Sequence, residues 1–336
     1  MRPTFHPSLV NGPFGDPALY VELLDRRPAL LFDLGEIPGL APRKILRLSH
    51  IFVSHAHMDH FAGFDRLLRV CLGRNKSLRL YGPPGFIDGV GHKLGGYTWN
   101  LVESYRDDLT LEVAEYSRGD PGRRARFRVR TGFHREELEP APFPDGTLVE
   151  ETGLRVRATE LDHRIPCLAF ALEEPDHINV WKNRLEERGL EPGPWLAGLK
   201  EAVRREESDN RPIRVAWRDP RGRPSTLPLG DLRDRVLSRE RGQKVAYVVD
   251  ALYSPPNAER IIELAQGADR LYIETPFRNR EAERAAATYH LTAGQAGHLA
   301  ALAGVRELVP FHFSPRHEHE ARELQREAFE ALHRAP

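Results

Sequence analysis

Short apolar runs, closed by glycine, proline or charged residues, recur along the chain and predict buried β-strands. These runs lie at residues 29–33, 51–53, 78–81, 154–172 (a strand pair), 244–249, 271–274 and 307–311. Apolar residues at helical spacing predict helices at 64–72, 281–288, 293–303 and 317–333. Residues 9–35 predict two strands joined by a Gly/Pro turn at 12–17. Strands that alternate with helices indicate an α/β fold.

One long stretch, residues 173–243, departs from this pattern. Glycine and proline are frequent in it, and apolar periodicity is weak outside residues 178–190. Its 15 Lys and Arg nearly balance its 14 Asp and Glu, so charge alone does not mark it as a nucleic-acid binder. We therefore predict a single domain over residues 1–336 that carries 173–243 as an inserted, projecting segment.

A second unusual stretch alternates arginine with apolar residues. The arginines occupy every second position, at Arg124, Arg126, Arg128 and Arg130. This period of two predicts a strand with one apolar face and one arginine face. Either the arginine face is simply solvated, or it contacts the phosphates of a nucleic acid, which requires clustered Arg or Lys.

Composition narrows the function classes. The 336 residues carry a formal net charge of zero, so no overall basicity points to a nucleic-acid partner. Hydrophobic residues make up 40% of the chain, which is enough for a substantial core. Cys71 and Cys167 form no C-x-x-C pair, which predicts core thiols in a reducing compartment. The sequence has no apolar signal core and no membrane-spanning run, so we expect a soluble, cytoplasmic protein.

The most informative chemistry follows the strand at residues 51–53. His55, His57, Asp59 and His60 lie within six consecutive positions, in an H-x-H-x-D-H pattern. A strand that ends in this pattern brings the imidazoles and the carboxylate toward one point. Imidazole and carboxylate suit zinc, and two separated donor sets suit two metals better than one. The alternative is a loop that is rich in histidine by accident.

Single candidate residues follow other predicted strands. His163 is either a third ligand of the first metal or a buried structural histidine, and Asp250 is placed to bridge two metals. His312 is a last ligand candidate. Asp33 is either an outer partner of the metal site or a turn former. His290 directly precedes a predicted helix N-terminus, where an anion such as phosphate is favoured.

This order of ligand candidates resembles the metallo-β-lactamase superfamily. Further stretches resemble ribonuclease Z, the zinc endonuclease that trims tRNA precursors at their 3′ end. They are Asp162-His163-Arg164-Ile165-Pro166 with Glu173, the pair Gly193 and Pro194, His290-Leu291-Thr292-Ala293 with Gln295-Ala296, and residues 311–316. The sequence departs from the family at Val249-Asp250-Ala251, where Gly-Asp-Thr is usual, and it lacks the glycine-rich opening motif.

The resemblance implies a four-layer αββα sandwich and two Zn²⁺ per chain. It implies one zinc ion held by His55, His57 and His163, a second held by Asp59, His60 and His312, and Asp250 between them. Two metals about 3.5–4 Å apart lower the pKa of a shared water and clamp the attacking and leaving oxygens. Asp59 would orient or deprotonate that water, and His290 would protonate the leaving oxygen or hold the phosphate. The role of Glu274, at a strand end, stays open.

The resemblance also implies a substrate and an assembly. Segment 173–243 resembles the family's flexible arm, so precursor tRNA or another RNA is the expected partner of a homodimer. The expected RNA-contacting residues are Gly193, Pro194, Arg124, Arg126, Arg128 and Arg130. The alternative, favoured by the neutral net charge, is another hydrolase of the same fold that acts on a small phosphodiester or other ester. A metal-free binding protein would require lost ligands, but all seven ligand positions are filled.

Overall fold

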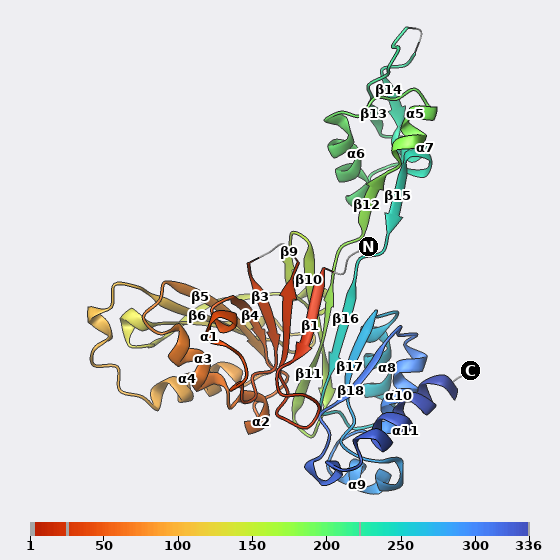
Figure 1. The fold of residues 1–336 in the computed structure, drawn as a ribbon. Helices are drawn as coiled ribbons and strands as arrows, with labels where there is room; N and C mark the ends of the chain where they lie inside the picture. The colour runs from red at the N-terminus through yellow and green to blue at the C-terminus, as the bar shows by residue number, and fades with distance from the viewer. Residues whose placement is uncertain (1–3, 25–26, 222, 335–336) are drawn as a thin grey trace. The chain divides into compact units, whose positions relative to one another are not determined.

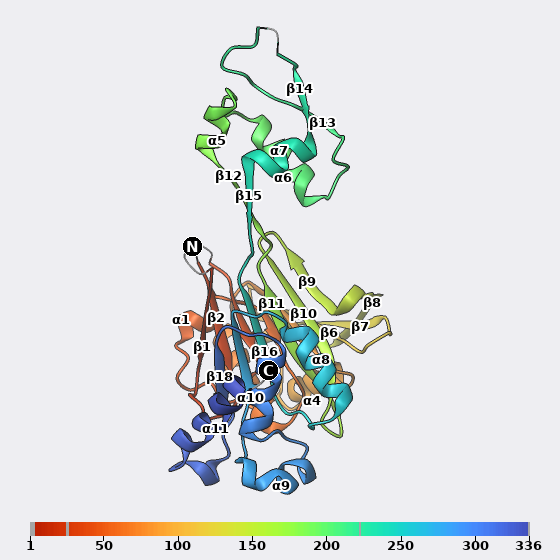
Figure 2. The same cartoon turned by 90° about the vertical axis from the view of Figure 1, so that its right-hand side faces the viewer.

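The structure is a computed structural model that describes residues 4–24, 27–221 and 223–334 (Figures 1 and 2). The chain divides into two compact units. Residues 1–174 and 243–336 form unit 1, and residues 175–242 form unit 2. Every residue that was predicted to bind a metal belongs to unit 1.

The first sheet of unit 1 has eight strands, in chain order, within the described residues. They are β1 (Phe5–Leu9), β2 (Leu19–Leu23), β3 (Ala29–Phe32), β4 (Leu48–Phe52), β5 (Lys76–Gly82), β6 (Leu109–Glu115), β7 (Gly122–Arg128) and β8 (Arg135–Ala141). Their connections contain α1 (Pro42–Ile45), α2 (Met58–Phe61), α3 (Phe64–Cys71), α4 (Phe86–Gly95) and the 3₁₀ turns η1 (Val102–Ser104) and η2 (Val129–Thr131). Strands β3 to β6 are parallel neighbours, so their carboxyl ends meet at one edge.

The second sheet has six strands in the order β18-β17-β16-β11-β10-β9, again within the described residues. They are β9 (Thr147–Glu151), β10 (Leu154–Asp162), β11 (Pro166–Glu173), β16 (Lys244–Val248), β17 (Arg270–Glu274) and β18 (Leu308–Phe311). With them come α8 (Pro255–Ala265), α9 (Ala282–Ala287), α10 (Ala293–Leu302), α11 (Ala321–Arg334) and the turns η3 (Pro144–Gly146), η4 (Asn279–Glu281) and η5 (Pro315–His317). Strands β16, β17 and β18 are parallel, and β10 also ends at their carboxyl edge because β11 is antiparallel to both β10 and β16.

The two sheets pack face to face, with helices on both outer faces (Figure 1). Both faces of the first sheet are apolar, as successive residues of β3 show: Phe32 points between the sheets, whereas Leu31 packs under the helices. Between the sheets, Phe32 stacks on Phe52 with ring centroids 4.9 Å apart, and Phe52 meets Phe170 of the other sheet at 5.7 Å. Helices α8, α10 and α11 cover the second sheet through a further apolar cluster. The predicted αββα sandwich is confirmed.

Unit 2 has its own small hydrophobic core. It contains the paired strands β12 (His177–Val180) and β15 (Leu237–Glu240), the pair β13 (Pro212–Arg214) and β14 (Thr226–Pro228), and the helices α5 (Lys182–Glu187), α6 (Trp195–Arg204) and α7 (Leu229–Val236). Leu185, Leu199 and Leu232 are fully buried in its centre. This core did not emerge from the weak apolar periodicity, because it combines single residues from several short elements.

Most predicted elements match observed strands and helices, with two corrections. Residues 9–35 contain two complete strands, β2 and β3, and the last residue of β1, but the 12–17 turn lies between β1 and β2 and does not join the two complete strands. The predicted arginine strand ends at Arg128, because the chain turns through η2 to Gly132, which has a φ of 62°. None of the helices in the described ranges is long and apolar enough to cross a membrane.

Candidate metal centre

The predicted ligands come together where strand ends of the two sheets meet. His55, His57 and His60 follow β4, His163 follows β10, and His312 follows β18. The first group that could hold a metal ion contains His55, His57, His163 and Asp250, and the second contains Asp59, His60 and His312. The ligand atoms in each group lie within 4.8 Å of one another. The structure therefore brings all seven predicted metal ligands into two adjoining clusters.

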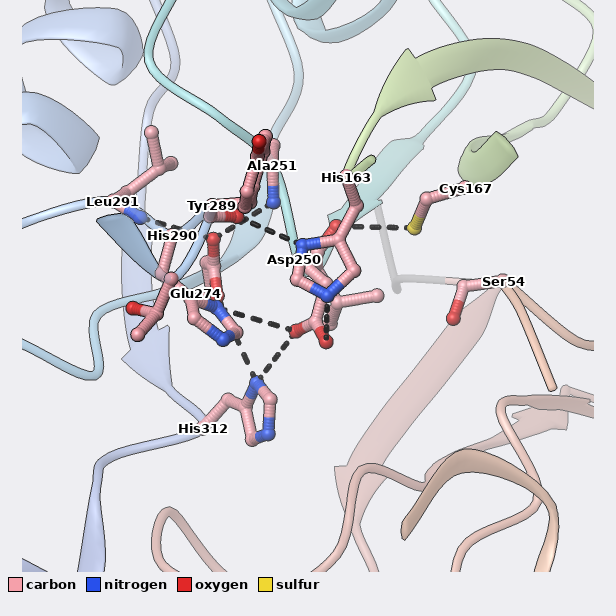
Figure 3. Close-up of polar contacts among 12 residues, drawn as sticks. Ser54, His163, Cys167, Asp250, Ala251, Glu274, Tyr289, His290, Leu291 and His312 are labelled. Atoms are coloured by element: carbon pink, nitrogen blue, oxygen red, sulfur yellow. Dashed lines mark hydrogen bonds and ion pairs between the residues drawn. The ribbon is translucent and has the colours of Figure 1, made fainter. Parts of the chain in front are cut away.

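Asp250 lies between His163 of the first cluster and His312 of the second (Figure 3). Its Oδ2 atom is 3.4 Å from Nε2 of His55, 3.4 Å from Nε2 of His60 and 3.5 Å from Nε2 of His163. Its Oδ1 atom is 2.9 Å from Nδ1 of His312. One carboxylate thus serves both donor sets, which is the arrangement that a bridge between two metals requires.

Several atoms at this centre that could bind a metal have no hydrogen-bond partner among the described residues. They are Nε2 of His55, Nε2 of His60, Oδ1 of Asp250 and Nδ1 of His312, all buried. The short approach of His312 to Asp250 does not have hydrogen-bond geometry, so both atoms stay unsatisfied. An unsatisfied buried polar group costs about 1–3 kcal/mol, and a bound cation removes that cost. The residues fit a pair of metal ions.

The histidines of the centre differ in charge. Burial lowers the pKa of His60 and of His312, but the neighbouring carboxylates, Asp33 and Asp250 for His60 and Asp250 for His312, outweigh this effect and raise both pKa values well above the usual range. Burial and the neighbouring charge of His60 lower the pKa of His55 to about 2, so its imidazole is neutral at pH 7. A neutral imidazole is the form that binds a metal. Burial raises the pKa of Asp59, but the imidazoles of His312 and His60, whose Nε2 atoms each lie 3.5 Å from its Oδ2 atom, outweigh this effect and hold that pKa well below its usual range. Asp59 is therefore a carboxylate.

Asp33 anchors His60 from behind. Its Oδ2 atom lies 2.9 Å from Nδ1 of His60, and the hydroxyl groups of Ser54 and Tyr247 donate to the same oxygen at 3.0 and 2.9 Å. Its Oδ1 atom accepts from the Ser54 amide at 2.7 Å. A hydrogen bond at Nδ1 fixes the ring and leaves Nε2 for a metal. Of the two predicted roles, the hydrogen bonds support that of an outer partner of the site; the φ of 56° places the Asp33 backbone in the left-handed region, but residue 33 is not part of a turn.

Two further histidines, His55 and His163, are oriented in the same way. Nδ1 of His55 lies 3.0 Å from Oγ of Ser54 and 3.7 Å from Sγ of Cys167. Nδ1 of His163 lies 2.8 Å from the carbonyl oxygen of Tyr289. In both rings Nε2 is the nitrogen that faces Asp250. Cys167 is fully buried, as predicted for a core thiol, although its position behind a ligand was not foreseen.

His290 is held by a buried carboxylate (Figure 3). Oε2 of Glu274 lies 2.7 Å from Nδ1 of His290, and Oε1 accepts from the amides of Ala251 and Leu291 at 2.9 and 3.1 Å. Burial lowers the pKa of His290, but the charge and hydrogen bond of Glu274 outweigh this effect and raise it. The predicted helix N-terminus after His290 is present, since Thr292 is the N-cap of α10 and exchanges hydrogen bonds with Gln295 in a capping box. His290 can therefore act as a proton donor through Nε2.

A pocket of about 550 Å³ opens onto these groups. Six predicted site residues line it, and three phenylalanines line it with them: His57, Asp59, His163, Asp250, His290, His312, Phe14, Phe277 and Phe313. A larger pocket of about 750 Å³ near Arg118 and Arg260 contains none of the predicted metal ligands. The smaller pocket is the one in which chemistry at the metal centre can occur.

No protein-family model matches the chain. However, the chain is 33% identical to the ribonuclease Z of Deinococcus radiodurans over 96% of its own length and 94% of that protein. The chain belongs to the ribonuclease Z family. It is thus a hydrolytic endoribonuclease of a metal-dependent family.

Solved structures show that this family member has the metallo-β-lactamase fold. YhfI of Bacillus subtilis, a metallo-β-lactamase fold protein, matches 96% of the chain and 91% of its own with a TM-score of 0.53 and 16% identity. The short form of human tRNase Z matches 94% of the chain and 93% of its own with a TM-score of 0.51 and 18% identity.

The predicted RNA-contacting residues of this ribonuclease Z family member lie outside the metal centre. On β7, Arg126 is 2.9 Å from Glu112 and 3.5 Å from Glu136, so acidic neighbours partly neutralise the arginine face formed by Arg124, Arg126 and Arg128. Arg130 lies beyond the strand and donates to the carbonyl oxygen of Arg106. Gly193 and Pro194 belong to unit 2, where Pro194 precedes α6.

Proposed function

We propose that this protein is a zinc-dependent endonuclease that removes the 3′ trailer from precursor tRNA, with two zinc ions per chain. The observation that carries the proposal is the position of Asp250 between two histidine clusters, with His290 beside them. The similarity to a ribonuclease Z over nearly the whole chain supports the same reading.

The residues divide between the two ions as follows. One ion would be held by His55, His57 and His163, the other by Asp59, His60 and His312, and Asp250 would contact both. When bound, the pair lowers the pKa of a water to near neutrality and neutralises charge on the phosphate.

The chain supplies the proton transfers. Asp59 is held ionised, so its free carboxylate oxygen can accept a proton from the attacking water. As the water oxygen bonds to phosphorus, the bond from phosphorus to the 3′-oxygen breaks. Because Glu274 occupies Nδ1 of His290, Nε2 is the atom that donates a proton to the departing 3′-oxygen. The tRNA body then ends in a 3′-hydroxyl, and the trailer begins with a 5′-phosphate.

We further propose that unit 2 is an arm that binds RNA. The guanidinium of Arg184 lies 4.4 Å from the ring centre of Trp181, and that of Arg223 lies 4.6 Å from that of Trp217. Paired cations and aromatic rings suit a nucleic-acid surface better than the arginines that are bound to carboxylates. Gly193 and Pro194, which resemble the family's arm motif, begin the adjacent helix α6. The arginine face of β7 is the weaker second surface, because of Glu112 and Glu136.

The assembly follows from the same proposal. In a cytoplasmic homodimer, the arm of one subunit would hold a tRNA that the metal centre of the other subunit cuts. Unit 2 then acts through binding, and unit 1 contains the complete chemistry.

One experiment tests the function directly. Purified protein is incubated with precursor tRNA and, separately, with bis-p-nitrophenyl phosphate, and its zinc content is measured. We expect trailer release that leaves a 3′-hydroxyl, and close to two zinc ions per chain. The second candidate is a hydrolase of small phosphodiesters, which the zero net charge favours. Hydrolysis of the small ester without any trailer release would establish that candidate instead.

A further inference from the structure

The pocket at the metal centre has an aromatic side that the proposed mechanism does not use. Phe14, Phe277 and Phe313 line it together with the metal-binding residues. No Lys or Arg is among the described residues that line this pocket. Phosphate groups therefore have no cationic side chain to pair with there, whereas a flat nucleobase can stack on a phenylalanine ring.

The rings follow one another in a definite order. The centroid of Phe277 is 6.0 Å from that of His290, and His290 is 6.1 Å from His312. Phe313, the next residue in the chain, meets Phe14 edge-on at 5.2 Å. Phe277 thus borders the proton donor, and Phe14 borders Phe313, the residue that follows His312.

The turn at residues 12–17 fixes Phe14 in the pocket wall. The Phe313 amide donates to the carbonyl oxygen of Pro13 at 2.8 Å, and the Gly35 amide donates to that of Pro17 at 3.1 Å. A Cβ atom at Gly35 would lie only 2.4 Å from the carbonyl oxygen of Asp59, so the turn packs tightly against the ligand loop. Phe14 is half-buried and still lines the pocket. A rigid, accessible ring at this place is suited to stacking.

We propose that Phe14 is the platform on which the base of the first trailer nucleotide stacks during cleavage. This inference rests on the proposed function. The 3′-oxygen that takes the proton from His290 belongs to the last nucleotide of the tRNA body, so that nucleotide lies beside Phe277. The nucleotide attached through the 5′-oxygen of the same phosphate then extends past His312 toward Phe14. Phe14 is a specificity-determining residue, and it takes no part in proton transfer.

The test combines protein variants with modified RNA. Phe14→Leu keeps an apolar side chain against Phe313 but removes the ring, and Phe14→Tyr keeps the ring. Base–aromatic stacking corresponds to a roughly 5- to 150-fold loss in kcat/KM when the ring is removed, and we expect Phe14→Leu to fall in this range on precursor tRNA. Phe14→Tyr should stay close to wild type. Unchanged zinc content and melting temperature in both variants show that the fold is kept.

An abasic site at the first trailer nucleotide provides the decisive comparison. The abasic site should lower the kcat/KM of wild type by about the same factor as the Phe14→Leu substitution does on normal RNA. In Phe14→Leu itself, the abasic site should lower kcat/KM only a little further. A second readout needs no turnover: 2-aminopurine at the same position, bound in the presence of a chelator, should be quenched by wild type and less by Phe14→Leu.

Two results overturn the inference. If the abasic site lowers kcat/KM by the same factor in wild type and in Phe14→Leu, the ring does not contact that base. If Phe14→Leu and wild type instead become equal when the abasic site is in the last nucleotide of the tRNA body, Phe14 contacts that nucleotide and not the first trailer nucleotide. Failure of wild type to cut any precursor tRNA would instead refute the proposed function on which the inference rests.

Discussion

Oδ2 of Asp33 lies 2.9 Å from Nδ1 of His60, and both side chains are fully buried. Since Ser54 and Tyr247 donate to the same oxygen, Asp33 is held in place from three sides. The position of His60, a proposed metal ligand, therefore depends on a carboxylate that follows the neighbouring strand β3 and on a tyrosine of the other sheet.

Asp33→Asn should weaken metal binding without unfolding the protein. Asparagine tolerates the positive φ at this position but does not provide the negative charge that accepts from His60. Loss of such an outer partner typically costs about 10–100-fold in metal affinity. Competition with a chromophoric chelator measures this loss. Tyr247→Phe is the matched control, because it removes one donor to the same carboxylate and should cost less.

Asp250→Asn should remove both metals or nearly all activity, because one carboxylate faces both donor sets. The loss should exceed the roughly 10–100-fold that is typical of outer partners. Elemental analysis and trailer cleavage are the measurements. The control is Asp162→Asn, since its side chain can still accept from the Arg164 amide and should retain both metals. Two bound metals in Asp250→Asn would show that the carboxylate is not a bridge.

His290→Ala should keep both metals and lose about 10²–10⁴-fold in turnover, the usual contribution of a general acid. Glu274→Gln should lower turnover less than His290→Ala does, and it should change the dependence of turnover on pH. Because Glu274 raises the pKa of His290, its replacement lowers that pKa, and the protonated acid is lost at a lower pH. The double variant with Glu274→Gln and His290→Ala should have a turnover only slightly lower than that of His290→Ala alone. Metal loss in His290→Ala would identify His290 as a ligand instead.

Replacement of residues 175–242 by a short Gly/Ser linker should spare zinc content and hydrolysis of bis-p-nitrophenyl phosphate. The linker is feasible because the Glu174 amide donates to the carbonyl oxygen of Gln243 at 2.8 Å, so the two ends are adjacent. Precursor tRNA cleavage should fall sharply, mainly through KM. Mixing arm-deleted chains with Asp250→Ala chains should restore some cleavage through mixed dimers. Equal tRNA cleavage with and without the segment would refute the arm.

Single arginines refine this prediction. Arg184→Ala and Arg223→Ala should each weaken tRNA binding, and each lost phosphate contact should reduce the salt slope by about 1. Arg233→Ala is the matched control, because Asp209 and Asp234 already bind this guanidinium. An equal effect of all three would show that general charge, not the Arg–Trp pairs, binds RNA.

Glu173→Gln should destabilise unit 1 at neutral pH but not in acid. Burial raises the pKa of Glu173, but bonds from Arg157 and Arg155 outweigh this effect and lower it from 4.5 to about 2. The carboxylate therefore stabilises the fold fully above pH 4.5, and the stabilisation is lost as pH falls toward 2. At pH 7 the free energy of unfolding should fall on the order of 2–3 kcal/mol. Urea titrations from pH 3 to 7 measure this, with Glu151→Gln, an exposed partner of Arg79, as the smaller control.

The sequence identified the residues that cluster at the strand ends because their signal is local. His55 to His60 lie in one loop, and single candidates such as His312 directly follow apolar runs. The partners that orient them could not be predicted in this way. Tyr247 reaches Asp33 only because the two sheets pack face to face. Glu274 reaches His290 where the segment after β17 pairs with the segment before α10, in the bridge between Phe277 and Thr292. Long-range packing of this kind leaves no periodic trace in a single sequence.

The arginine stretch shows which property of a strand its own sequence does not predict. Its period of two correctly predicted a strand with Ala125 and Phe127 buried. Its charge, however, depends on which residues face it from the neighbouring strands, and Glu112 and Glu136 lie there. A strand's own sequence therefore gives its buried face, but the charge of its outer face depends on its partners.

Three residues of the site, Asp33, Asp250 and His312, have φ values of 56°, 45° and 55°. A non-glycine residue in this region costs of order 1–3 kcal/mol, so the backbone at each position would be more relaxed with glycine. Glycine would relieve this strain but would also remove the proposed bridging carboxylate, a proposed ligand and the carboxylate that holds His60. In directed evolution of this enzyme, heat resistance and catalysis must be selected together.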